Sequence, residues 1–219
     1  SSRNKRQTRT LLTSNLYPKG LNTVTVTDNI IPRDAFRSSN VKEVILGDGV
    51  TAIKPYAFYS SSLKKIVFNE VITTLPDSVF SKCSNLKSVT LTSSIKSING
   101  AFENCTGLVT VNFVEGLESI SKGFLGCEWL REFTLPDSLK SIKNRAFGNC
   151  KAIKEFRFGT GLQEISADAF VDDRDDYGSV EAFYVDEENP YLYSFDGVVY
   201  SYAGDLVAYP ENKKATCSD

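Results

Sequence analysis

The chain has 219 residues, of which 41 % are hydrophobic and 24 % are charged, and its formal net charge is −2. This composition is typical of a globular domain and excludes a largely disordered chain, and the small net charge excludes a general electrostatic attraction to nucleic acid or to anionic membranes. No apolar run approaches the roughly 18 residues that span a bilayer, so we expect no membrane insertion. Histidine, the usual side chain for proton transfer near neutral pH, is absent from the sequence.

Residues 1–20 are predicted to form a leader and an N-terminal cap. The first ten residues, SSRNKRQTRT, contain four basic groups and no acidic one. A flexible leader left by processing or cloning fits this stretch better than a polybasic anchor. Leu11, Leu12 and Leu16 are expected to fold back over the first coil of the domain that follows.

From Leu21 onwards, one sequence unit recurs along the chain. A degenerate copy occupies residues 21–40, and the strand part of the unit recurs once more from Val180. A period in the twenties is typical of a solenoid, in which one coil cannot bury its own apolar face and must stack on its neighbours. We therefore expect about seven coils over residues 21–185. The full copies, 22 or 23 residues apart, begin at Val41, Leu63, Leu86, Leu108, Leu130 and Ile153.

Each unit is predicted to contain a short strand, a second aliphatic segment and a phenylalanine. In the unit that starts at Leu86, Val89 and Leu91 point into the core and the residues beside them face solvent. Ile95 and Ile98 pack from the opposite wall. One phenylalanine per unit then forms a column through the core: Phe36, Phe58, Phe80, Phe102, Phe124, Phe147 and Phe170. Six more phenylalanines occupy inward strand positions: Phe68, Phe113, Phe133, Phe156, Phe158 and Phe183. We therefore expect the phenylalanine rings to pack in the core rather than bind a cofactor.

Four cysteines each lie three residues after a column phenylalanine: Cys83, Cys105, Cys127 and Cys150. Coils stacked about 4.8 Å apart would hold their thiols in a line, where a tetrahedral zinc site cannot form, and neither a histidine nor a C-x-x-C pair is present. Parallel Cβ vectors leave neighbouring Cβ atoms slightly too far apart for an unstrained disulfide. We therefore predict buried free thiols, and neither a metal nor a cofactor.

An insertion, VDDRDDYGS, lengthens the unit after Ile153 to 27 residues and brings together Asp172, Asp173, Asp175 and Asp176. Clustered carboxylates attract hard cations such as calcium. However, the D-x-D-x-D-G spacing of a calcium loop is missing and Arg174 lies in the middle of the cluster. We interpret the insertion as a solvated loop, and whether it binds calcium stays open.

The unit LREFTLPDSLKSIKNRAFGNC, residues 130–150, resembles the BspA-like (Treponema-type) leucine-rich repeat at nearly every position. The segment ENPYLYSFDGVVYSYAGDLVAYP is similar to the non-repeat module that often closes such arrays, so residues 186–219 are assigned to a C-terminal hairpin module and tail. The predicted fold is an α/β solenoid, mostly β: a leucine-rich repeat right-handed superhelix with a parallel sheet on the concave face and a C-terminal β-hairpin cap. The resemblance further implies a secreted or cell-surface protein used in adhesion or in host-matrix or protein recognition.

Binding is predicted to take place on the outward strand positions. Acidic, basic, small polar and aliphatic groups alternate there, which suits a macromolecular partner better than a reaction centre. We expect a monomeric, non-catalytic domain that binds an extracellular protein or glycan. A structural spacer in a surface protein and an unrecognised carboxylate-based hydrolase are the alternatives.

The candidate binding residues on the concave face are Thr110, Asn112, Glu132, Thr134, Glu155, Arg157 and Tyr184. The energetic centre is expected near Arg157 and Tyr184, because these residue types are enriched at binding hot spots. A second hypothesis places the contact on the tyrosine-rich terminal module, at Tyr193, Tyr200 and Tyr202.

Overall fold

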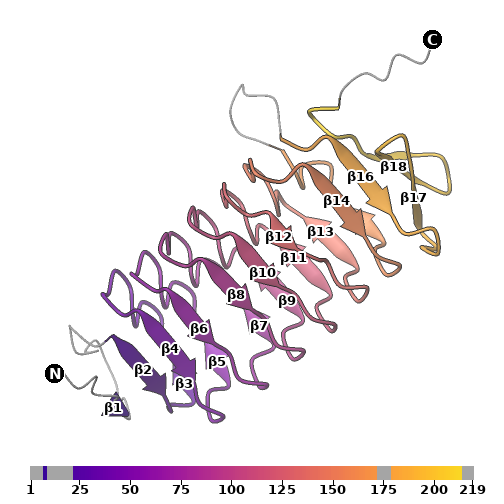
Figure 1. Ribbon diagram of the computed structural model, residues 1–219. Coiled ribbons are helices and arrows are strands. Elements are labelled where there is room, and N and C mark those ends of the chain that lie inside the picture. The colour runs from indigo at the N-terminus through magenta and orange to yellow at the C-terminus, as the bar shows by residue number, and fades with distance from the viewer. Residues whose placement is uncertain (1–6, 9–21, 172–178, 214–219) are drawn as a thin grey trace.

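A computed structural model describes residues 7–8, 22–171 and 179–213, which form a parallel β-solenoid (Figure 1). Seven successive coils each contribute two short strands, one to each of two opposite walls, so the solenoid is mostly β as predicted. The described part of the chain contains no helix, and hence no helix that could cross a membrane. Several residues discussed above lie outside the described residues: Leu11, Leu12, Leu16, Asp172, Asp173, Arg174, Asp175 and Asp176. Cys217, the fifth cysteine of the chain, also lies outside them.

The first wall is a row of parallel strands whose outward side we call the strand face; it is the face on which binding was predicted. It contains β2 (Thr23–Val26), β4 (Glu43–Leu46), β6 (Lys65–Val67), β8 (Ser88–Thr90), β10 (Thr110–Asn112), β12 (Glu132–Phe133), β14 (Glu155–Phe158) and β16 (Ala182–Val185). At the N-terminal end, β1 (Gln7–Thr8) pairs in parallel with β2. The strands hydrogen-bond in three groups, which are β1-β2-β4-β6, β8-β10-β12 and β14-β16.

The two interruptions in this wall, between β6 and β8 and between β12 and β14, both follow a coil of 23 residues. These coils begin at Leu63 and Leu130, whereas the 22-residue coils that begin at Val41, Leu86 and Leu108 are all followed by a paired strand. One extra residue offsets the backbone of a coil against the next, as a β-bulge does. The 27-residue coil is different, because β14 pairs with β16 despite the insertion.

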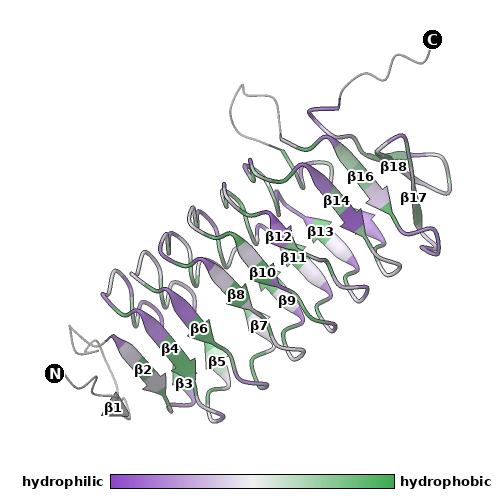
Figure 2. Cartoon of the chain, viewed as in Figure 1, coloured by the Kyte–Doolittle hydropathy of each residue, from purple (hydrophilic) through white to green (hydrophobic). Residues whose placement is uncertain are grey.

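The second wall consists of shorter strands. β3 (Ile30–Ile31) pairs with β5 (Ala52–Ile53), and the remaining five form one parallel sheet: β7 (Thr74–Leu75), β9 (Ser97–Asn99), β11 (Ser119–Ser121), β13 (Ser141–Lys143) and β15 (Glu164–Ile165). Ile95 and Ile98 are fully buried against the first wall, as predicted. Hydrophobic and hydrophilic residues both occur within single strands (Figure 2), which is expected where alternate side chains face the core and the solvent.

The phenylalanine column runs through the core as predicted. From Phe36 to Phe147 the six rings are buried, and successive ring centroids lie 4.8 to 5.4 Å apart with interplanar angles of 15° or less. Phe170, the last member, is half-buried and lies 6.2 Å from Phe147. Of the six other inward rings, four are buried, whereas Phe113 and Phe133 are only partly buried against the core.

Each loop that carries a buried column phenylalanine contains two left-handed residues, two positions before and two positions after the ring. In the loop of Phe102 these are Gly100 (φ 60°) and Asn104 (φ 57°). The loops of the other five buried rings repeat the pattern, mostly with residues other than glycine, for which this conformation is unfavourable. Backbone hydrogen bonds to the next coil hold it in place: Asn104 N donates to the carbonyl of Leu125 at 2.7 Å.

An antiparallel sheet, with strand order β17-β18-β19, closes the C-terminal end of the solenoid. The predicted hairpin corresponds to β17 (Leu192–Phe195) and β18 (Val198–Ser201), and β19 (Leu206–Ala208) extends it. Phe183 N on β16 donates to the carbonyl of Gly197 in the hairpin turn at 2.9 Å. The turn therefore covers the outer edge of β16, which would otherwise present unpaired backbone groups.

Buried Asn189 fastens this terminal module to the last coil. Its Nδ2 donates to the carbonyls of Gly159 and Leu162, both at 2.9 Å, and its Oδ1 accepts from Tyr191 N at 2.8 Å and Leu192 N at 2.9 Å. Both ends of the amide are thus satisfied. Asn69 makes an equivalent set of four hydrogen bonds inside the solenoid. Its Nδ2 donates to the carbonyls of Gly47 and Val50, and its Oδ1 accepts from Val71 N and Ile72 N.

Candidate functional site

The seven predicted binding residues lie on the strand face, in the C-terminal half of the solenoid. They are Thr110 and Asn112 on β10, Glu132 on β12, Thr134 directly after β12, Glu155 and Arg157 on β14, and Tyr184 on β16. Thr110 is half-buried and the other six are exposed. The alternation of inward and outward side chains therefore places all seven on one surface across four neighbouring strands.

The part of this surface on β10 and β12 is occupied by its own hydrogen bonds. Thr110 Oγ1 donates to Glu132 Oε2 at 2.7 Å, and Asn112 Nδ2 donates to Thr90 Oγ1 at 3.0 Å. Both contacts follow from the strand register, which places Thr110 beside Glu132 and Asn112 beside Thr90. The polar side chains on this part of the strand face therefore form a ladder of hydrogen bonds with one another.

The part on β14 and β16 is organised around Arg157. The parallel register pairs Arg157 with Tyr184, and the guanidinium carbon lies 4.4 Å from the centroid of the tyrosine ring. Arg157 Nη2 also lies 3.2 Å from Glu155 Oε2, although the arginine side chain is still 73 % exposed. Stacking on an aromatic face restricts the guanidinium while leaving most of its donors free for a partner.

A depression of about 410 Å³ lies between β12 and β14, where the strand ladder is interrupted. Its lining includes three of the predicted residues, Thr134, Glu155 and Arg157. The prediction missed the others, among which half-buried Phe133 is the most informative, because an inward ring that stays partly exposed marks an opening in the wall. The signal available in the sequence was the 23-residue coil. The missed lining residues are Arg131, Phe133, Leu135, Ala152, Ile153 and Lys154.

A second and more open groove, of about 670 Å³, lies next to the depression and shares Arg131 with it. It runs across the turns that precede β8, β10 and β12. Its lining residues are Ser84, Lys87, Thr106, Gly107, Val109, Glu128, Trp129 and Arg131. None of the seven residues predicted from the sequence lines this groove.

The terminal module presents the aromatic cluster of the second hypothesis. Tyr193 lies 5.6 Å from Tyr200 and 5.3 Å from Tyr202, measured between ring centroids. Tyr193 and Tyr202 are exposed and Tyr200 is half-buried. Phe195, at 72 % exposure, lies outside the core. The three tyrosines therefore form one cluster on the terminal module.

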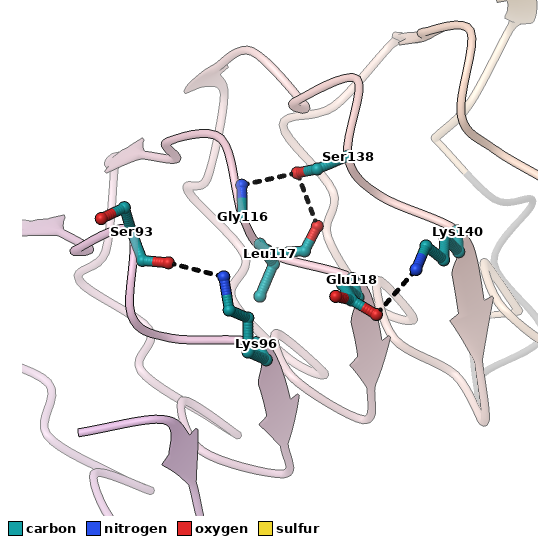
Figure 3. A network of polar contacts seen from close by, with 7 residues as sticks. All are labelled: Ser93, Lys96, Gly116, Leu117, Glu118, Ser138 and Lys140. Atoms are coloured by element: carbon teal, nitrogen blue, oxygen red, sulfur yellow. Dashed lines mark hydrogen bonds and ion pairs between the residues drawn. The ribbon is translucent and has the colours of Figure 1, made fainter. Parts of the chain in front are cut away.

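Near the second wall, several polar side chains are paired with neighbouring groups of the protein (Figure 3). Lys140 Nζ lies 2.9 Å from Glu118 Oε2, and Lys96 Nζ donates to the carbonyl of Ser93 at 3.0 Å. Ser138 Oγ accepts from Gly116 N and donates to the carbonyl of Leu117. The hydrogen bond from Lys140, helped by the charge of Lys96, lowers the pKa of Glu118. The Glu118–Lys140 ion pair and the hydrogen bonds of Ser138 link neighbouring coils, whereas the Lys96–Ser93 hydrogen bond lies within one coil.

The four cysteines of the repeat are free and buried in a line beside the phenylalanine column. Each thiol donates to the carbonyl of a phenylalanine one coil earlier, for example Cys105 Sγ to Phe80 O at 3.1 Å. Burial raises the pKa of Cys83 to about 11, and it raises the pKa values of Cys105 and Cys127 well above the ordinary range. Across the described ranges, no group of three or more acidic or cysteine side chains is placed to hold a metal ion.

These thiols are expected to be unreactive until the protein unfolds, because the thiolate is the reactive species and burial disfavours it. In a Cys217→Ser background, a thiol reagent at pH 8 should detect no thiol in the native protein and four in denaturant. Adding Thr106→Cys, at an exposed position, supplies a positive control that should react at once. Detection of fewer than four thiols after denaturation would show that bridges had formed.

The comparisons with known proteins agree on the type of repeat. A model of the BspA type leucine rich repeat region matches residues 14–123 and 121–173 in six copies. A leucine rich repeat protein of T. pallidum superposes with a TM-score of 0.58 at 22 % identity, covering 63 % of this chain and 72 % of that protein. For a leucine-rich repeat protein of Bacteroides ovatus ATCC 8483 the TM-score is 0.57 and the identity 25 %, over 72 % of this chain and 43 % of that protein.

A leucine rich cell surface protein of Faecalibacterium prausnitzii A2-165 shares 28 % identity over 53 % of this chain and 30 % of its own length, with a TM-score of 0.45. The chain thus spans less than half of the length of the Bacteroides and Faecalibacterium proteins. No curated protein sequence matches it.

Proposed function

The chain belongs to the BspA-type leucine-rich repeat family, and from this premise we propose that it is a non-catalytic recognition domain that binds an extracellular protein or glycan. We further propose a secreted or cell-surface location and a role in adhesion or matrix recognition, which the family resemblance suggests. The consensus residues of the repeat are buried, so recognition falls to the outward residues that differ from coil to coil.

The observation that carries this proposal is the Arg157–Tyr184 pair at the edge of the depression between β12 and β14. The depression has apolar side chains in its floor, including Phe133 and buried Ile153. Arginine and tyrosine beside a pocket that a partner can desolvate are the features of a binding hot spot. The flat ladder of Thr110, Asn112 and Glu132 on one side would let a partner approach closely.

The hydrolase alternative receives less support from the same geometry. Glycoside hydrolysis needs two carboxyl groups that flank the scissile bond. On the predicted surface, Glu132 accepts a hydrogen bond from Thr110, and Glu155 is paired with Arg157. Among the seven predicted residues, both carboxylates are thus already engaged by neighbouring side chains.

The test begins with an array of purified extracellular matrix proteins and glycans, from which a bound partner is selected. The double variant Arg157→Ala/Tyr184→Ala is then expected to bind this partner at least tenfold more weakly, which corresponds to about 1.4 kcal/mol. Its thermal melt, followed by circular dichroism, should match that of the parent, because both side chains lie outside the core.

The chain offers a matched control in Arg37→Ala/Tyr59→Ala, which removes a similar stacked pair with 4.6 Å between the guanidinium carbon and the ring centroid. This variant should bind like the parent. A loss of affinity in Tyr193→Ala/Tyr202→Ala alone would move the site to the terminal module. Absence of binding across the whole array would favour the structural spacer.

A further inference from the structure

Trp129, the only tryptophan of the chain, is 60 % exposed in the turn that precedes β12. No other large hydrophobic side chain in the described coils, residues 22–171, is as exposed. An exposed indole offers a flat apolar face with a polar N–H at its edge, on which a ligand ring can stack.

The coil before Trp129 has a glycine at the equivalent position. Trp129 lies two residues after Cys127, and the equivalent residue one coil earlier is Gly107. A Cβ atom at Gly107 would overlap the carbonyl oxygen of Ser84, so the close stacking of the coils requires glycine there. Gly107 is itself buried and its Cβ position would lie 2.9 Å from Lys87 Nζ, so the groove beside the indole is lined by Lys87 together with the exposed hydroxyl residues Ser84 and Thr106.

Two cations border the groove at a separation that the solenoid sets. Lys87 and Arg131 occupy the same repeat position two coils apart, with Val109 between them. Neighbouring strands lie about 4.8 Å apart, which separates these two positions by roughly 10 Å.

The groove has an excess of positive charge, although the chain as a whole has a net charge of −2. Lys87 makes no ion pair with any residue that the structure describes, and Arg131 Nε is 3.8 Å from Glu132 Oε1, a long contact. Glu128, the acidic residue of the lining, is paired with Lys151 at 3.7 Å. The groove is therefore complementary to a ligand with separated negative charges.

We propose that this groove binds an acidic polysaccharide in which a carboxylated sugar alternates with a neutral one. The flat face of a sugar ring stacks on Trp129, and its hydroxyls meet the hydroxyl groups of Ser84 and Thr106. A pyranose unit is close in length to one coil spacing, so Lys87 and Arg131 match carboxylates on every second sugar. An acidic peptide supplies the charges but not the flat polyhydroxylated ring.

This assignment goes beyond the strand-face proposal and does not rest on it. Its three principal residues, Lys87, Trp129 and Arg131, are absent from the predicted set, and the strand-face variant Arg157→Ala/Tyr184→Ala retains all of them. Failure of one proposal therefore leaves the test of the other intact.

The single tryptophan makes the groove directly measurable by fluorescence. Hyaluronate octasaccharide, in which glucuronate alternates with N-acetylglucosamine, is expected to shift and quench the emission of Trp129 in a saturable manner at low salt. The effect should weaken as the ionic strength rises, because exposed charges are screened. The variant Lys87→Gln/Arg131→Gln should bind at least tenfold more weakly, with an unchanged thermal melt.

The matched control is Lys96→Gln/Lys140→Gln, which removes two lysines that are also two coils apart but lie at the second wall. It should bind hyaluronate like the parent. By calorimetry, Trp129→Leu should lose at least tenfold in affinity. The proposal would be overturned by an unchanged emission at millimolar hyaluronate, by equal binding of a neutral chitin oligosaccharide or of a polyglutamate peptide, or by a control variant that weakens as much as Lys87→Gln/Arg131→Gln.

Discussion

Replacing Phe102 by alanine is expected to lower the free energy of unfolding by about 3–5 kcal/mol. Phe102 is fully buried, and its ring centroid lies 5.3 Å from that of Phe80 and 5.4 Å from that of Phe124, with the rings nearly parallel. Alanine would leave a cavity in the middle of the column. The neighbouring rings are held in register by their own coils, so they cannot move to fill it.

Urea unfolding followed by circular dichroism measures this loss. Because each coil is stabilised mainly by its neighbours, the damage should spread to the adjacent coils and lower the midpoint of the whole transition. Phe195→Ala is the matched control, since this phenylalanine is 72 % exposed and its loss should change stability by less than about 0.5 kcal/mol. A loss below about 1 kcal/mol for Phe102→Ala would contradict the role assigned to the column.

Asn189→Ala is expected to release the terminal module from the solenoid, at a cost of about 3 kcal/mol in docking free energy. The variant removes four hydrogen bonds at once and leaves the carbonyls of Gly159 and Leu162 without their amide donor. It also removes the acceptor of two backbone N–H groups at the start of β17, so the hairpin loses its anchor. The coils keep their contacts with one another.

Hydrogen exchange measured segment by segment tests this expectation. In Asn189→Ala, amides of β17 to β19 should exchange much faster, while those of β8 to β11 should exchange as in the parent. Asn69→Ala loses an identical set of bonds inside the solenoid and should instead destabilise the coils around β4 and β6. Unchanged protection of β17 to β19 in Asn189→Ala would show that other contacts hold the module.

The repeat period was sufficient to predict the solenoid, the coil boundaries and the phenylalanine column. Val89, Ile98 and Phe102 are all buried as expected. Such positions are readable from one sequence because burial requires only that an apolar side chain recurs at the spacing of the coil, and stacking then supplies identical surroundings every time.

The conformation of the phenylalanine loops could not be predicted in the same way. Tyr56, Lys82 and Arg145 are left-handed, although none of these residue types favours that conformation. At Lys82 a hydrogen bond to the next coil holds this conformation, because Lys82 N donates to the carbonyl of Glu103 at 2.9 Å. The anchoring role of Asn189 was hidden for the same reason, since its acceptors lie 27 and 30 residues earlier in the chain.

By itself, the sequence determined which residues of this protein face the core and which face solvent, because strand alternation and the repeat period are local properties. The arrangement of the surface was decided only by the tertiary structure. The depression beside Arg157 exists because a 23-residue coil leaves β12 and β14 unpaired, and the groove beside Trp129 is formed by the turns of three successive coils. Both features depend on how one coil is placed against the next. Stacking of the coils alone establishes the hydrogen-bond register and the close packing between residues about 22 positions apart.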